Sequence, residues 1–181
     1  MRAIAALLFL FAFAGDAAAE ARIEDLTIAL DGTRVLASFT LADAFHHRLR
    51  ERIDSGLPTS IFYQFELDKD RQRWYDRHLA DTTLETVAMY DAVAQQYTVN
   101  YKLDGKLVES RTVRDRRALE QAMTRIEGVP LFTIDKYPHQ WRLLVKMRAE
   151  LGSRTILSMI PVAITTDWVE SKKFRAPAPP A

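Results

Sequence analysis

The sequence contains no cysteine. This absence excludes disulfides, thiolate nucleophiles, cysteine-ligated metal sites and the lipidated cysteine of a bacterial lipoprotein. The six glycines are scattered singly along the chain, so none of them builds a phosphate-binding loop or a dinucleotide fingerprint. No serine lies in a nucleophile-elbow motif, and no two histidines have metalloprotease spacing. The formal net charge is only +1, which gives no bulk electrostatic case for nucleic acid as a partner.

The N-terminus has the pattern of an export signal. Arg2 precedes an apolar run from Ile4 to Ala14, and the small residues 17–19 fit a cleavage site that leaves Glu20 first in the mature chain. A membrane-spanning helix needs about 20 apolar residues, and this run is shorter. We therefore expect a cleaved signal and a periplasmic or secreted protein without a transmembrane span, with an uncleaved anchor as the alternative. An exported chain without cysteine fits a bacterial periplasm best.

Apolar residues at alternate positions dominate the mature chain, which is typical of strands with one buried face. The expected strands are 22–30, 35–41, 61–67, 82–90, 96–103, 106–113, 139–150 and 155–164, with 168–174 as a further candidate. Asp31-Gly32 predicts a hairpin with a two-residue loop, which places Leu30 opposite Thr33.

Two stretches change to the period of an amphipathic helix. The first has an apolar stripe of residues four apart: Leu41, Phe45, Leu49 and Ile53. Thr40 or Asp43 is its expected N-cap, and Gly56 is its expected stop. The second helix is predicted from about Arg114 to Glu127, with a stripe that includes Ile126 and a stop at Gly128.

These elements predict a mainly β (α+β) fold: an antiparallel β-sandwich or half-open barrel of about seven to eight strands, with two short amphipathic helices over an edge or open end. The predicted organisation is a signal peptide at 1–19, a single β-rich domain at 20–175 and a Pro/Ala-rich tail at 176–181. One register stays open. At Asp104-Gly105, a two-residue loop places Leu103 opposite Lys106, and a longer loop places it opposite Leu107.

Two basic clusters are candidate binding surfaces. The first comprises Arg71, Arg73, Trp74 and Tyr75, joined by Arg77. Arginine with Trp and Tyr gives large contact area at low entropic cost, which is typical of recognition surfaces. The second comprises Arg111, Arg114, Arg116 and Arg117 at the start of the second helix, where the positive end of the helix dipole favours an anion such as a phosphate or a lipid headgroup. The alternative for both is a solvated patch, with the aromatic pair of the first packed on the sandwich.

A polar segment holds Asp76, His78 and Asp81, which could supply an acid, a base or metal ligands. The alternative is a solvated loop, because nothing in the sequence positions these side chains. We therefore assign no catalytic, cofactor-binding or metal-binding residue and expect no cofactor.

Several strings resemble one family. They are FTLADAF, SGLP, IFYQFEL, RQRWYD, QWRLLVKMRAEL and DWVES, and they cover the chain from about Ile23 to Phe174. Together they resemble a family of exported bacterial proteins catalogued as domain of unknown function 4390. The resemblance implies export and a single soluble domain, and it supplies no activity and no catalytic residue.

Three hypotheses follow. The first is a non-enzymatic module that binds another envelope or membrane protein. The second is a carrier or sensor for an apolar or anionic small molecule, based on aromatic residues inside a barrel and the arginines from 111 to 117. The third is an enzyme that uses Asp76, His78 and Asp81.

The export signal is tested by the mass of the protein recovered from the cell envelope. We expect a chain that begins at Glu20, because the three small residues before it suit signal peptidase. N-terminal sequencing checks the same point. A mature protein that still begins at Met1 would contradict the prediction.

Overall fold

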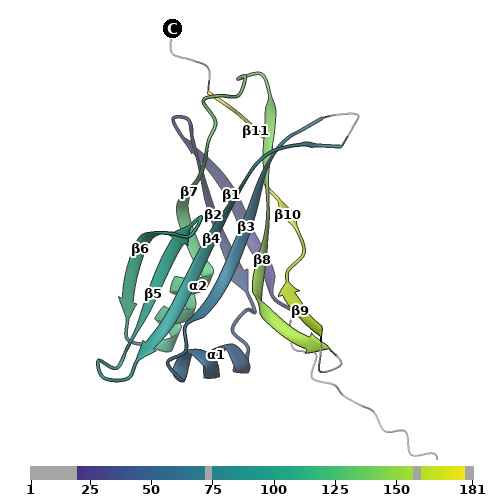
Figure 1. Cartoon of the computed structure of the whole chain (residues 1–181). Helices are drawn as coiled ribbons and strands as arrows, with labels where there is room; N and C mark the ends of the chain where they lie inside the picture. The colour runs from purple at the N-terminus through teal and green to yellow at the C-terminus, as the bar shows by residue number, and fades with distance from the viewer. Residues whose placement is uncertain (1–19, 72–74, 157–159, 178–181) are drawn as a thin grey trace, which may run out of the picture.

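A computed structural model describes residues 20–71, 75–156 and 160–177 of the chain (Figure 1). The predicted signal peptide and the last four residues of the predicted tail lie outside this part. The strands are β1 (Arg22–Asp31), β2 (Arg34–Ala42), β3 (Thr59–Lys69), β4 (Arg77–Asp91), β5 (Gln96–Leu103), β6 (Lys106–Val113), β7 (Arg125–Thr133), β8 (Arg142–Ile156), β9 (Ile160–Thr165), β10 (Val169–Glu170) and β11 (Phe174–Arg175). The helices are α1 (His47–Asp54) and α2 (Arg116–Thr124).

The strands form two antiparallel sheets that do not close into a barrel. The large sheet has the order β10-β8-β3-β4-β5-β6, and β9 and β11 also pair with β8. The small sheet has the order β1-β2-β7 and crosses behind the large one in Figure 1. Helix α1 contacts β3 and β4, whereas α2 contacts strands of both sheets. The predicted class, a mainly antiparallel β protein with two short helices, is confirmed.

The inward faces of the two sheets meet in a core of packed side chains. Alternate residues of β2, β3 and β8 are buried, as period-two patterning predicts. The ring of Phe39 on β2 lies 4.8 Å from the ring of Tyr63 and 5.7 Å from the ring of Phe65, both on β3. At this level the space between the sheets is therefore filled by aromatic side chains rather than left open for a ligand.

Helix α1 begins later than its apolar stripe predicts. Leu41 is buried in β2, where strand pairing with β1 continues to Ala42, and Asp43 then takes a left-handed backbone conformation that ends the strand. The N-cap is His46, which makes no side-chain capping bond, so the expected caps Thr40 and Asp43 are wrong. The four-residue spacing of the predicted stripe therefore does not mark one helix, because Leu41 is a strand residue that happens to fit the period of the helix after it. Leu49 and Ile53 do form the buried face of α1.

Helix α2 ends earlier than predicted, and its last predicted turn is strand β7. Pairing of Arg125 with Thr40 on β2 draws this segment into the small sheet. The hydroxyl of Tyr63 donates to the carbonyl of Met123 at 2.7 Å, and the hydroxyl of Tyr101 donates to the carbonyl of Ala122 at 2.6 Å. These bonds satisfy two of the carbonyls that a helix C-terminus leaves without partners. The helix therefore stops without a glycine cap.

Gly128 lies within strand β7 and does not end helix α2. The ladder between β2 and β7 is irregular at this point, and Gly128 has a φ of +62°, a conformation that glycine adopts without steric cost. Its N–H donates to the hydroxyl of Ser38 at 2.9 Å. The glycine that predicts a helix stop therefore marks a bulge in β7.

The two hairpins differ from expectation in different ways. In the first, the loop is Gly32-Thr33, so Leu30 pairs with Val35 and the predicted partner Thr33 is wrong. The shift is two residues, which leaves the apolar side chains on the same face. In the second, Leu103 pairs with Lys106, which settles the open register in favour of the two-residue loop.

The bond from Tyr63 to the end of α2 is tested by Tyr63→Phe. The substitution keeps the ring and removes the donor to a buried carbonyl, so we expect the free energy of unfolding to fall by about 1–3 kcal/mol. Urea unfolding followed by circular dichroism measures it. Tyr90→Phe is the matched control, because the Tyr90 hydroxyl has no hydrogen-bond partner within the described residues. Equal stability of the two variants would contradict the role given to Tyr63.

Candidate functional site

Two strand edges face the same groove. Within the described residues, β6 pairs only with β5 and β7 pairs only with β2, so each has one edge without a neighbouring strand. A cavity of about 250 Å³ lies between them. It is lined by Leu84, Tyr101, Val108, Glu109, Arg111, Arg125, Ile126, Glu127, Gly128, Val129 and Pro130. We call this cavity the seam groove, because it runs along the open junction of the two sheets.

The floor of the seam groove is apolar, and each of its two walls carries one arginine–glutamate ion pair. Leu84, Tyr101 and Ile126 are buried members of the core. On the β6 wall, the Arg111 guanidinium bonds to Glu109, at 3.1 Å for one of the contacts, and lies 4.9 Å from the centre of the Tyr101 ring. On the β7 wall, Arg125 pairs with Glu127 at 3.0 Å. The hydrogen bond from Arg111 lowers the pKa of Glu109, so this carboxylate keeps its charge at neutral pH.

Strand β6 is unusually exposed for a strand of an eight-stranded sheet. Of its eight residues only Val113 is half-buried, and Leu107 and Val108 are 62% and 56% exposed. The ladder with β5 has a bulge near these two residues, between Tyr101 and Lys102. We did not predict this exposure, although the adjacent apolar pair Leu107-Val108 in a strand with alternating polar residues is a signal for it.

Helix α2 is tied to the large sheet by a network around Asp54. The Asp115 side chain caps α2 by accepting from the Ala118 N–H at 2.8 Å. Asp54, at the end of α1, accepts from the Tyr97 hydroxyl at 2.9 Å and from the Arg116 guanidinium at 2.7 Å. Burial is the main cause that raises the pKa of Tyr97. Strand β5 and both helices are thus joined at one carboxylate.

The arginines predicted as an anion site are divided between these structures. Arg111 lines the seam groove, and Arg116 forms an ion pair with Asp54. Arg114 and Arg117 are exposed and make no ion pair with a described residue. The anion site at these residues stays a prediction.

The described members of the arginine–aromatic cluster are Arg71 and Tyr75, between β3 and β4, and Arg77, the first residue of β4. Arg71 is exposed and its backbone N–H donates to Asp76 at 3.3 Å, and the Tyr75 side chain is 96% exposed. Arg73 and Trp74 lie outside the described residues. A recognition surface here stays a prediction, and Tyr75 is not packed on the sheets as the alternative would require.

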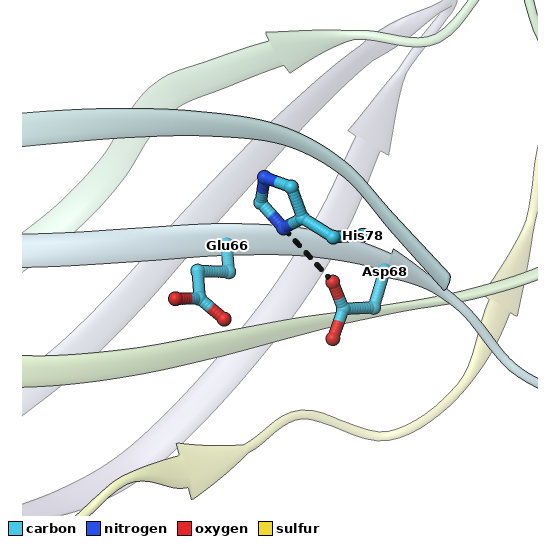
Figure 2. Close-up of side chains that lie close together, drawn as sticks. All are labelled: Glu66, Asp68 and His78. Atoms are coloured by element: carbon cyan, nitrogen blue, oxygen red, sulfur yellow. Dashed lines mark hydrogen bonds and ion pairs between the residues drawn. The ribbon is translucent and has the colours of Figure 1, made fainter. Parts of the chain in front are cut away.

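The sequence predicts a polar loop over 68–80, and the structure has a shorter one, because β3 extends to Lys69 and β4 begins at Arg77. His78 is therefore a strand residue. Its Nδ1 lies 3.3 Å from Oδ1 of Asp68, a contact drawn as the dashed line in Figure 2, and its Nε2 lies 3.1 Å from Oδ1 of Asp81. Burial lowers the pKa of His78, but the hydrogen bonds and charges of Asp81 and Asp68 outweigh it, and the net pKa is raised.

Asp68 is the residue that sequence analysis missed in this cluster. It is 4% exposed, and its Oδ2 lies 3.0 Å from Nζ of Lys146 on β8. The same Nζ lies 3.5 Å from Asp76 and 3.5 Å from Glu170. Burial lowers the pKa of Lys146, and these three carboxylates raise it by more, so the net pKa is raised. The predicted Asp76 and His78 do lie in one network, which Asp68 and Lys146 connect.

A larger cavity, about 700 Å³, lies at the strand ends, between the turn after β1 and the loop before β8. Its lining includes Ile134, Tyr137, Pro138 and Ala176. Ala176, the first residue of the predicted tail, is buried against the core. This cavity is open to solvent, and a small-molecule carrier stays a prediction.

In the part of the chain that the structure describes, neither helix is long and apolar enough to cross a membrane. Comparison with curated proteins and with solved structures gives no match. A family model described as a domain of unknown function (DUF4390) matches residues 18–168, which is most of the chain. The chain therefore belongs to the family of domain of unknown function 4390.

Proposed function

We propose that the protein is an exported, periplasmic binding module that holds an extended segment of another envelope protein in the seam groove. One observation carries the proposal: two strand edges without a neighbouring strand line the same groove over an apolar floor. Its periplasmic location is supported by the N-terminal signal pattern and by the absence of cysteine.

An exposed strand edge presents a row of backbone N–H and C=O groups to any chain that can pair with it. Addition of an extended segment to such an edge is a recurring mode of peptide recognition, in which backbone hydrogen bonds supply affinity and side-chain pockets supply specificity. Beyond its bulge, strand β6 pairs regularly with β5 from Glu109 to Val113, so the backbone that carries its opposite edge is regular there. A segment paired there would also contact β7, since both strands line the groove.

The lining of the groove defines the chemistry of the segment. Leu84, Tyr101 and Ile126 accept apolar side chains from every second position, because alternate residues of a strand share a face. The charged pair on each wall, Glu109 with Arg111 and Arg125 with Glu127, favours polar side chains of both signs near the rim. The preferred partner is thus an amphipathic strand-forming segment rather than a uniformly acidic one.

Site-specific photo-cross-linking in cells tests the proposal. A photoreactive residue placed at Glu127 lies on the β7 wall and should capture one discrete envelope protein. Val108→Asp on the opposite wall puts a charge beside the apolar floor and should reduce this adduct at least about tenfold, which corresponds to about 1.4 kcal/mol. Because Val108 is 56% exposed, we expect its substitution to change stability by no more than about 0.5 kcal/mol.

Val93→Asp is the matched control, because Val93 is 96% exposed in the turn after β4 and lies outside the groove. It should leave the adduct unchanged. Two results would sink the proposal: no discrete adduct at Glu127, or an equal loss of the adduct with both aspartate variants.

A further inference from the structure

We propose that Glu66, Asp68 and His78 form a binding site for a divalent transition-metal ion, with Zn²⁺ as the best match to its ligands. The site lies on β3 and β4, and it does not depend on the function proposed for the seam groove. The three residues each offer one ligand atom, and these atoms all lie within 4.8 Å of one another. Figure 2 shows the three side chains close together over the two strands.

A bulge brings the histidine to this position. Glu66 pairs with Asp81 and Leu67 pairs with Ala80, and the register then shifts so that Asp68 pairs with His78. In an unbroken ladder Leu79 would lie opposite Asp68. The bulge places a nitrogen ligand there, while Leu79 packs against the core. Re-aiming of one side chain is a known use of bulges next to functional sites.

Neighbouring groups orient two of the three ligands. Asp81 contacts Nε2 of His78 at 3.1 Å, which turns Nδ1 toward the carboxylate of Asp68. Histidines that bind metals generally donate their other N–H to a carboxylate or a carbonyl in this way. Lys146 occupies Oδ2 of Asp68 at 3.0 Å and leaves Oδ1 facing His78. The supporting contacts of a metal site are therefore present around the proposed ligands.

The charges around the site favour a cation. Five carboxylates take part in the cluster: Glu66, Asp68, Asp76, Asp81 and Glu170. Lys146 and the half-exposed imidazole of His78 are the basic groups that these contacts join. A bound dication would reduce this excess of negative charge.

The ligand types select the class of metal. One imidazole and two carboxylates suit Zn²⁺ and similar first-row ions, whereas Ca²⁺ takes six to eight oxygen ligands. Three protein ligands also leave a coordination position for water, as in open zinc sites. Glu66 is half-buried and His78 is exposed, so an ion can reach the site from solvent.

Isothermal titration of the tag-free mature chain with zinc chloride at pH 7.5 tests the site. We expect saturable binding of one ion per chain, and His78→Gln should weaken it at least about tenfold. Asp68→Asn should do the same, but Asp68 is buried and this variant is used only if its circular dichroism matches the wild type. His47→Gln is the matched control, since His47 also pairs with a carboxylate, Glu51 on α1, at 3.2 Å.

Thermal unfolding is a second measurement, which does not rely on calorimetric heats. A ligand that binds only the folded chain raises its melting temperature, so zinc should raise that of the wild type and of His47→Gln, and not that of His78→Gln. Zinc affinity that is equal in the wild type and His78→Gln would overturn the proposal. So would a lack of one-to-one binding, because His78 would then serve only as an ion-pair partner.

Discussion

The architecture depends on how α2 ends. Two tyrosines of the large sheet, Tyr63 and Tyr101, donate their hydroxyl hydrogens to the carbonyls of Met123 and Ala122. A helix end buried in a protein needs such partners, because a carbonyl without one loses about 1–3 kcal/mol of hydrogen bonding that water supplied in the unfolded chain. With these carbonyls satisfied, the next residue can join the small sheet without a connecting loop.

Strand β7 follows α2 directly, and its first residues form one wall of the seam groove. Helix α2 contacts strands of both sheets, including β6 and β7. The two sheets do not close into a barrel, and a cavity of about 250 Å³ remains between β6 and β7. The buried tyrosines thus link the packing of the core to the shape of the candidate binding surface, since Tyr101 caps the helix and also forms part of the groove floor.

Local signals predicted β5 and β6 to the residue, because alternation and a two-residue turn are properties of the segment itself. The segment 125–127 continued an amphipathic stripe, yet it became a strand because pairing with β2, far away in sequence, outweighed its local preference. The predicted site residues show the same limit. His78 was a candidate from its type alone, whereas its contact with Asp68 depends on a bulge and on the pairing of β3 with β4.

The burial of Asp68 separates the metal-site proposal from a purely structural interpretation. A charge taken out of water costs several kcal/mol, and a buried ion pair is often no more stable than an apolar pair of similar volume. An apolar pair in place of Asp68 and Lys146 would therefore cost the fold little, whereas loss of Asp68 alone would leave Lys146 without its nearest partner. The structure instead keeps a carboxylate there, with one oxygen on Lys146 and the other facing His78. An ion pair that adds little net stability is explained by a ligand that binds the oxygen facing His78.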